Sequence, residues 1–356
     1  MEKQNKILDL INKLEQTRDL SQEEMLYLLD HIDEEGRALL SDKADKARKK
    51  YYDDRVYMRG LIEFTNYCKQ NCMYCGIRGS NTNVDRYRLS EEGILECVKI
   101  GYDLGYRTFV LQGGEDPYYT DEMIVSIIQN IKKSYPECAI TLSIGEKSYD
   151  SYKKYYDAGA DRYLLRHETA SKELYEKLHP KMSLEKRVRC LYDLKEIGYQ
   201  VGTGFIVGLP YQTNKHITED LMFIKKLKPH MVGIGPFMPQ KDTPLGEHQS
   251  GTASQTVLLI SILRLMQPDL LLPATTSLGS VDPKGREKGL KAGANVVMPN
   301  LSPTDVREKY ALYDGKICTG DEAAHCRHCI EGRIKSAGFT VDMQRGDNAM
   351  WVKENR

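Results

Sequence analysis

Eight short apolar runs, rich in β-branched residues, alternate with amphipathic stretches between Arg59 and Met298, and this alternation constrains the fold more than any other feature. Repeated strand–helix units build a parallel sheet that helices cover. Eight units are the number of a closed (β/α)8 barrel, and a doubly wound open sheet is the main alternative. The predicted strands are 59–65, 107–112, 139–144, 162–166, 201–207, 231–237, 270–275 and 295–298.

The predicted barrel has an extension at each end. Residues 1–56 are expected to be helical throughout, because apolar residues recur at helical spacing and Ser21 forms a capping box with Glu24. Further helices are predicted over 90–104, 184–197 and 215–227. We therefore predict a helical extension over 1–56, the barrel over 57–303 and a carboxyl-terminal extension over 304–356.

Composition excludes several classes of protein. The 51 Lys and Arg residues balance the 51 Asp and Glu residues, which argues against a basic nucleic-acid surface or a membrane-surface helix. No apolar run approaches the ~18 residues of a membrane span, and the charged amino terminus does not resemble a signal peptide. A cytoplasmic protein is predicted, in which nine cysteines are metal ligands or catalytic thiols rather than disulfides.

One cysteine group directly follows the first predicted strand, at the end where barrel enzymes carry their active sites. In YCKQNCMYCG, Cys68, Cys72 and Cys75 have C-x3-C-x2-C spacing. Three thiolates on one loop can bind three irons of a 4Fe-4S cluster and leave the fourth iron for a small chelating molecule. Zinc is the alternative, but a closed structural zinc site needs four protein ligands, and this loop has no His or fourth Cys.

A second cysteine group lies near the carboxyl end. Cys318, Cys326 and Cys329 have C-x7-C-x2-C spacing, with His325 and His328 between them. Thiolates and imidazoles this close together predict a second metal site. An iron–sulfur cluster, zinc and an empty site all remain open.

The first motif, with the aromatic Tyr74 directly before its last cysteine, resembles the defining motif of the radical S-adenosylmethionine (SAM) enzymes. The resemblance implies that the open iron chelates SAM and that an electron from the cluster cleaves SAM to a 5′-deoxyadenosyl radical. Gly113, Gly114 and Glu115 resemble the segment that holds the SAM amino group in that family. The resemblance also implies cofactor contacts for Ser143, Glu168, Arg187 and Ile234.

Six segments extend the resemblance to the HydE-type maturases of FeFe-hydrogenase, which are similar to biotin synthase and methylornithine synthase. The segments are GGEDP (113–117), RHETA (166–170), VGLPYQT (207–213), VGIGPFMPQKDTPL (232–245), PATT (273–276) and ANVVMPN (294–300). The implied substrate residues include Arg166. The others are implied to line an internal cavity away from the cluster: Thr141, Arg162, Thr275, Thr276, Tyr310 and Tyr313.

The resemblance implies that the radical attacks the sulfur of a cysteine-ligated Fe(CO)2(CN) complex. The maturase HydG would supply this complex and the scaffold protein HydF would receive the product, while an auxiliary cluster at Cys318, Cys326 and Cys329 would be dispensable. One alternative is a radical SAM mutase or sulfur-inserting enzyme acting on an amino acid. Another is a non-enzymatic iron–sulfur carrier, which would bind a cluster without cleaving SAM.

Overall fold

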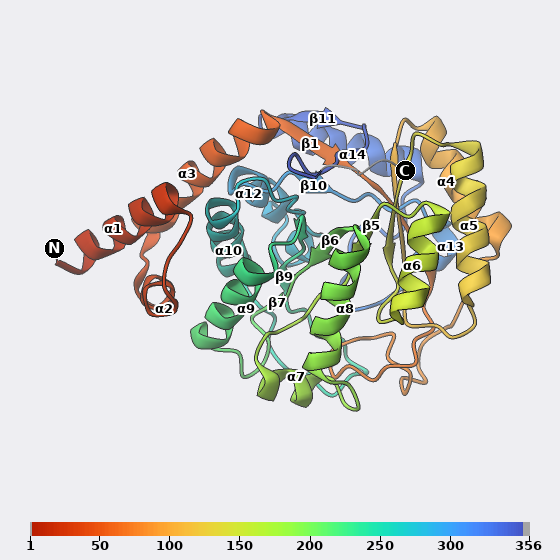
Figure 1. Ribbon diagram of the computed structural model, residues 1–356, viewed down its shortest axis with the longest axis horizontal. Coiled ribbons are helices and arrows are strands. Elements are labelled where there is room, and N and C mark those ends of the chain that lie inside the picture. Colours follow the sequence, from red (N-terminus) through yellow and green to blue (C-terminus); the bar gives the residue numbers. More distant parts are fainter. Residues whose placement is uncertain (1, 352–356) are drawn as a thin grey trace.

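The computed structural model describes residues 2–351 and has a parallel β-barrel at its centre, surrounded by helices (Figure 1). Six strands pair in the order β2-β3-β4-β5-β6-β8. Parallel bridges then link Met231 to Leu271, Pro273 to Val296, and Asn300 back to Leu61. The predicted (β/α)8 fold class is confirmed, although bridge positions alone represent the seventh strand.

The strands are short and mostly buried on both faces, as expected for parallel strands covered by helices. Two smaller sheets extend the ring: β7 pairs with β9, and β1 pairs with both β10 and β11. The strands are β1 (Arg55–Met58), β2 (Gly60–Thr65), β3 (Thr108–Gly113), β4 (Ala139–Ser143), β5 (Arg162–Leu164), β6 (Gln200–Thr203), β7 (Ile206–Val207), β8 (Met231–Val232), β9 (Gly235–Pro236), β10 (Val296–Val297) and β11 (Thr340–Asp342).

The helices predicted over 90–104, 184–197 and 215–227 are confirmed to within one residue at their ends. Side chains of Ser, Thr or Asp cap many of them, including the predicted box of Ser21 and Glu24. The helices are α1 (Glu2–Thr17), α2 (Gln22–His31), α3 (Glu34–Tyr52), α4 (Glu91–Asp103), α5 (Asp121–Ser134), α6 (Tyr149–Ala158), α7 (Lys172–Leu178), α8 (Leu184–Ile197), α9 (Asn214–Leu227), α10 (Ala253–Met266), α11 (Thr276–Val281), α12 (Gly285–Lys291), α13 (Thr304–Arg307) and α14 (Ala323–Ser336). No helix in the described part of the chain is long and apolar enough to cross a membrane.

The prediction that residues 1–56 are helical throughout is wrong at its end. Helix α3 stops at Tyr52, and strand β1 starts at Arg55. Val56 of this strand is paired with Val341 of β11. A pairing between segments so far apart in the sequence leaves no local signal. The sequence pattern alone therefore does not separate Arg55 and Val56 from the preceding helix.

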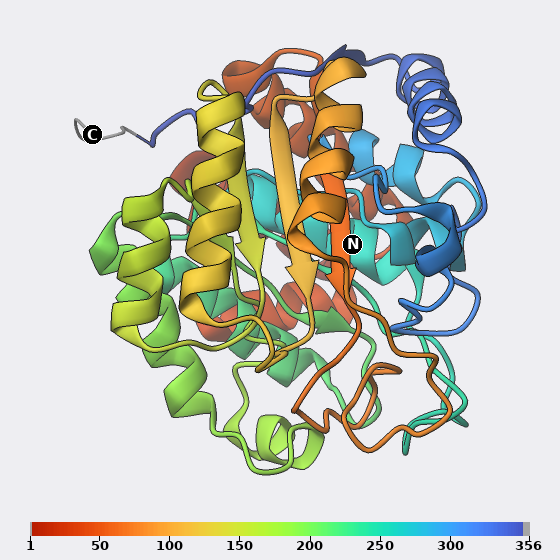
Figure 2. The same ribbon diagram turned by 90° about the vertical axis from the view of Figure 1, so that its right-hand side faces the viewer.

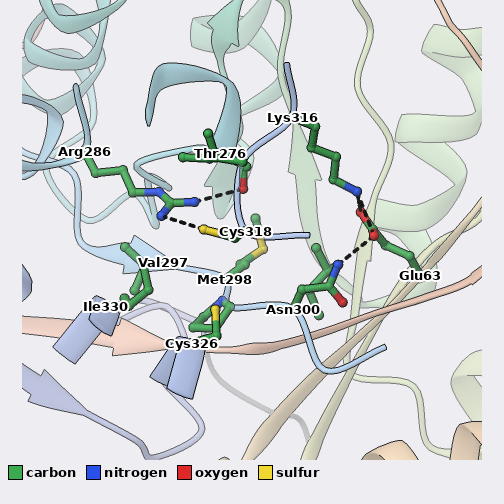
Figure 3. A pocket seen from close by; sticks show the side chains of 13 residues that line it. Glu63, Thr276, Arg286, Val297, Met298, Asn300, Lys316, Cys318, Cys326 and Ile330 are labelled. Carbon is green, nitrogen blue, oxygen red and sulfur yellow. Dashed lines mark hydrogen bonds and ion pairs between the residues drawn. The ribbon is translucent and has the colours of Figure 1, made fainter. Parts of the chain in front are cut away.

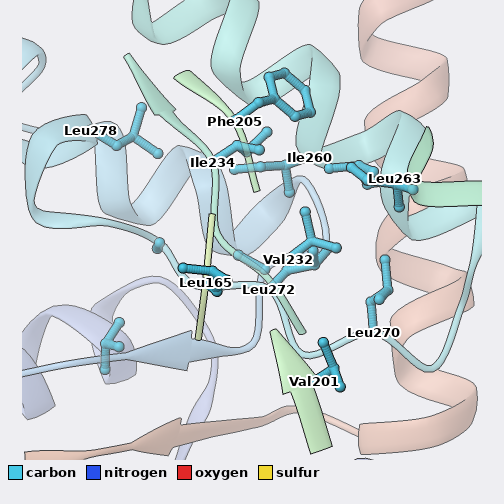
Figure 4. Packing of buried hydrophobic residues seen from close by; sticks show 14 of the residues in the cluster. Leu165, Val201, Phe205, Val232, Ile234, Ile260, Leu263, Leu270, Leu272 and Leu278 are labelled. Carbon is cyan, nitrogen blue, oxygen red and sulfur yellow. The ribbon is translucent and has the colours of Figure 1, made fainter. Parts of the chain in front are cut away.

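The main apolar core fills the space between the barrel wall and the surrounding helices. Figure 4 shows part of it, where Leu165, Val201 and Val232 of the barrel face Ile260 and Leu263 of α10. All five are almost fully buried. Burial of such side chains stabilises the fold by roughly 1.5–3 kcal/mol each, and it fixes the strand ends that carry the polar residues described below.

The two ends of the barrel differ in what covers them. The loop that leaves β2, drawn in orange, lies beyond the arrowheads of the strands (Figure 2). The carboxyl-terminal segment, drawn in blue, crosses the opposite end (Figure 2). There the backbone carbonyl of Arg345 accepts from the hydroxyl of Thr108 at 2.8 Å, and that of Gly346 accepts from Nη2 of Arg59 at 3.0 Å. This segment forms a floor under the barrel.

Candidate functional site

The first cysteine motif lies on the loop after β2, at the carboxyl end of the barrel. Its three thiols are half-buried. Sγ of Cys68 accepts hydrogen bonds from the backbone N–H groups of Gln70 and Glu115, each at 3.4 Å. A Cβ on Gly114 would lie 2.1 Å from the carbonyl oxygen of Tyr67. Glycine is therefore required at this position for β3 to approach the cysteine loop.

The chemistry of the three thiols fits an iron–sulfur cluster. Burial raises the pKa of each thiol, that of Cys75 to about 12, and charge on Cys68 or Cys75 raises the pKa of Cys72 further. Among residues 2–351, no three metal-ligating side chains converge closely enough to hold one metal ion. In a 4Fe-4S cluster each thiolate binds a different iron, whereas a closed zinc site gathers four ligands on one ion. The donor set therefore fits the cluster better than zinc.

A charged network joins the next strand ends to this loop. Nε of Arg187 donates to Glu146 at 2.8 Å, and its Nη1 donates to the backbone carbonyl of Arg166 at 2.7 Å. Glu115 accepts from the backbone N–H of Glu146 at 2.9 Å and from Nε2 of Gln70 at 2.6 Å. Glu146 had no role in the sequence-based prediction, although a carboxylate directly after an apolar strand is a signal that could have found it.

Glu168 is partly buried, with its side chain 16% exposed, but its Oε2 atom is buried. Its Oε2 lies 3.0 Å from Nη2 of Arg166, yet neither atom has an aligned hydrogen-bond partner in the described part of the chain. Glu168 also adopts a φ of 65°, in the left-handed region that favours glycine. Buried polar atoms are normally hydrogen-bonded. These unsatisfied atoms, beside the cysteine loop, fit a carboxylate that contacts a polar cofactor.

The other predicted cofactor residues lie around the same end. Oη of Tyr74 lies 2.8 Å from Nε2 of His179, which fixes the aromatic ring beside α7. Gly113 and Ser143 are the last residues of β3 and β4. Ile234 lies between β8 and β9 and is packed in the apolar core (Figure 4).

Two of the predicted substrate residues lie deeper in the barrel. Thr141 lines an interior pocket together with Arg59, and its Oγ1 has no hydrogen-bond partner within residues 2–351. Arg162 begins β5 at the floor, where its Nη2 donates to Asp347 at 2.6 Å. The structure thus places Arg162 and Arg166 at opposite ends of β5.

The predicted position of Tyr310, away from the cluster, is wrong. Tyr310 packs with Ile77 and Tyr87 in a buried apolar cluster that contacts Cys68 and Cys75. The chain after β10 folds back over the cysteine loop, as shown by the hydrogen bond from Nδ2 of Asn66 to the carbonyl of Lys309. This contact joins distant parts of the sequence and could not be seen in local patterns.

A second pocket lies between the barrel wall and the carboxyl-terminal extension (Figure 3). In it, Nη2 of Arg286 donates to the hydroxyl of Thr276 at 3.2 Å, while Glu63 accepts from Lys316 at 2.7 Å and from Asn300 at 2.7 Å. Glu63 was not predicted as a site residue, although a carboxylate inside an apolar strand was a visible signal.

The remaining predicted residues lie near this second pocket. Oγ1 of Thr275 caps α11. Burial raises the pKa of Tyr313 to about 12, although the nearby charge of Arg286 acts to lower it. Cys318 and Cys326 line the pocket, and Sγ of Cys318 accepts from Nη1 of Arg286 at 3.7 Å. Cys329 is exposed. The second metal site therefore stays a prediction.

Comparison with known proteins agrees with this geometry. The family model of the radical SAM superfamily matches residues 62–224, which contain the cysteine loop, Glu168 and Arg187. The chain is 44% identical, over 93% of its length and 94% of the relative, to the FeFe-hydrogenase maturase subunit HydE of Thermotoga maritima. It is 34% identical, over 83% of each chain, to 3-methylornithine synthase of Methanosarcina acetivorans.

A solved structure supports the same relationship. The crystal structure of methylornithine synthase superposes with a TM-score of 0.83 at 30% identity, covering 94% of this chain and 97% of the other. The match therefore includes both extensions as well as the barrel. The chain belongs to the radical SAM superfamily and, within it, to the family of the hydrogenase maturase HydE.

Proposed function

We propose that Cys68, Cys72 and Cys75 hold a 4Fe-4S cluster and that SAM binds between this cluster and Glu168. The observation that carries the proposal is the partly buried carboxylate of Glu168, at the same barrel end as the three thiols. Its buried Oε2 has no aligned hydrogen-bond partner in the described part of the chain. When bound and reduced, the cluster supplies the electron that cleaves SAM to the 5′-deoxyadenosyl radical. The Gly114 approach to the loop and the network of Arg187, Glu146 and Glu115 support the proposal.

The protein's own groups have separate tasks in this site. Glu168 offers an acceptor for cofactor hydroxyl groups. Arg187, held by Glu146 and by the carbonyl of Arg166, keeps its Nη2 available for a carboxylate. The apolar packing of Tyr310 against the cysteine loop excludes water from that side. Together these groups bind and orient a charged cofactor.

We further propose that the substrate is a cysteine-ligated Fe(CO)2(CN) complex, attacked at its sulfur during maturation of FeFe-hydrogenase. The 44% identity to a HydE maturase over nearly the whole chain supports this substrate. HydG as the supplier and HydF as the recipient are part of the same proposal, as is a cytoplasmic location. A reaction on an amino acid is the second candidate, favoured by the similarity to methylornithine synthase.

An anaerobic assay tests these proposals. The protein is reconstituted with iron and sulfide, dithionite and SAM are added, and 5′-deoxyadenosine is measured with and without a synthetic complex. Formation of an adenosyl–sulfur adduct that requires Cys75 supports the maturase. SAM cleavage that the complex leaves unchanged contradicts this substrate and favours an amino acid. A cluster-loaded protein that cleaves no SAM is a carrier and not an enzyme of this class.

A further inference from the structure

The backbone at Glu168 is held in an unfavourable conformation by its neighbours on β6 and β7. Its N–H donates to the carbonyl of Gly204 at 3.0 Å, and its carbonyl accepts from the N–H of Ile206 at 3.2 Å. A left-handed φ at a residue other than glycine costs free energy, and it persists only where the surrounding structure enforces it. These two hydrogen bonds fix the peptide groups of Glu168. They do not fix the residues of the turn that come directly before and after it.

Buried side chains on β6 and α9 hold these neighbouring residues of the turn in place. Nδ1 of His167 lies 2.9 Å from Oγ1 of Thr203 on β6. Its Nε2 contacts Oδ1 of Asp220 on α9 at 3.3 Å, without an aligned hydrogen bond. The same Oδ1 accepts from the backbone N–H of Ala170 at 2.5 Å. Asp220 therefore contacts the turn both before and after Glu168.

These side chains are too deeply buried to react with a substrate. His167, Thr203 and Asp220 are each 0% exposed, and none of them lines either pocket. Burial lowers the pKa of His167 to about 3 and raises that of Asp220 well above its usual range. Both shifts favour the neutral forms, so burial weakens any ion pair between the two groups. Burial of the Asp220 carboxyl group costs free energy, because its Oδ2 has no hydrogen-bond partner among the residues described. Stability alone therefore does not explain this residue.

We infer that His167 and Asp220 are positioning residues, which act through the turn 167–170 to hold the carboxylate of Glu168 in the cofactor site. The inference rests on the proposed function, because it takes Glu168 to be a SAM contact. It adds two residues, one of them on a helix outside the barrel, that determine SAM affinity without contacting SAM. Loss of either support would let Glu168 relax toward an ordinary backbone conformation.

The test is a double-mutant cycle on SAM affinity, measured by titration of SAM into the cluster-loaded protein. Asp220→Leu should weaken SAM binding about tenfold in the wild-type background and by less than twofold in the Glu168→Gln background, because residues that act through one group are not additive. Asp220→Asn keeps an acceptor for the N–H of Ala170 and should stay within about threefold of wild type. Glu219→Gln, the neighbouring position on α9, is the matched control and should not change affinity.

Two further measurements keep the test independent of activity and of one variant's folding. In the metal-free protein, hydrogen exchange of residues 166–171 should be faster in Asp220→Leu than in wild type, with the rest of the barrel unchanged. Thr203→Val removes the hydroxyl beside His167 with little change of shape, and it should weaken SAM binding in the same non-additive way.

The outcomes separate this inference from the proposed function. If wild-type protein binds SAM and Glu168→Gln weakens binding, but Asp220→Leu and Thr203→Val do not, the positioning role is wrong and the proposed function stands. Equal effects of Asp220→Leu in both backgrounds also overturn the inference, since the residue would then act without Glu168. A cluster-loaded wild-type protein that binds no SAM, or a Glu168→Gln variant that binds it normally, overturns both.

Discussion

Two arginines at opposite ends of β5 have contrasting surroundings. Arg162, at the floor, donates through Nη1 to Thr108 at 3.2 Å and through Nη2 to Asp347 at 2.6 Å, and only its Nε lacks a partner among the residues described. Arg166, at the carboxyl end, is close to Glu168, yet its Nε and Nη2 have no aligned partner among the residues described. A buried charge with most of its hydrogen bonds made holds a fold together, whereas a charged group that leaves most of its hydrogen bonds unmade persists where function needs it. We therefore assign a structural role to Arg162 at the floor and a role in ligand binding to Arg166 at the carboxyl end of the barrel.

The largest effect is expected at the cysteine loop. Cys75→Ala removes one of three cluster ligands, so bound iron should fall and 5′-deoxyadenosine formation should drop to the background level. Cys138→Ala is the matched control, because Cys138 is a buried cysteine directly before β4, at the floor. Iron analysis and product quantification check both variants. If Cys75→Ala and Cys138→Ala lost product equally, the reaction could not be assigned to the carboxyl end of the barrel.

Glu168→Gln should weaken SAM binding by about tenfold or more, because hydrogen bonds to a charged acceptor are worth about 1.5–3 kcal/mol. The free energy of unfolding should hardly change, since Oε2 makes no aligned hydrogen bond within residues 2–351. Titration of SAM and denaturant unfolding of the metal-free protein measure the two quantities. A variant that loses stability and keeps its SAM affinity would show that Glu168 is structural.

Asp347→Asn should lower the stability of the protein and leave its SAM affinity almost unchanged. It leaves Arg162 buried without its charged partner, so unfolding should become easier by about 1–3 kcal/mol. SAM affinity of the loaded protein should stay within about twofold, since Asp347 lies at the floor. Denaturant unfolding and SAM titration provide the check. Tenfold weaker SAM binding without loss of stability would contradict the structural role of the floor.

The floor should also make stability depend on pH. Burial alone would raise the pKa of Asp347, but the charge of Arg162 and hydrogen bonds from Arg345 and Gln200 lower it to about 2. Because the folded pKa is below the unfolded value near 3.9, the stabilisation is complete above about pH 5 and is lost as the pH falls toward 2. The stability difference between wild type and Asp347→Asn should therefore shrink between pH 5 and pH 2. A constant difference across this range would exclude the ion pair as its source.

The smallest effect is expected at the second cysteine group. Cys329 is exposed, so Cys329→Ser should change the free energy of unfolding by less than about 0.5 kcal/mol and SAM cleavage by less than about twofold. Thermal unfolding and product formation measure this. A loss of SAM cleavage as large as that of Cys75→Ala would make the second group part of the reaction.

The sequence predicted what depends on local pattern. Each strand has its own apolar run, and the cysteine spacing is complete within one loop, so the barrel and the first motif could be recognised. Strand β1 could not, because Val56 pairs with Val341 at the other end of the chain. The different environments of Arg162 and Arg166 also depend on a segment near the carboxyl end that crosses the floor. The conformation of Glu168 depends on β6 and α9, and no pattern around residue 168 encodes it.

A titration of SAM tests whether the cofactor binds at the carboxyl end of the barrel. SAM is added to cluster-loaded wild type, Glu168→Gln and Asp347→Asn under the same anaerobic conditions, and the dissociation constant is measured for each. We expect the dissociation constant of SAM to rise about tenfold or more in Glu168→Gln and to stay within about twofold of wild type in Asp347→Asn. Wild-type affinity in Glu168→Gln, with weakened binding in Asp347→Asn, would contradict the assignment of the cofactor site to the carboxyl end of the barrel.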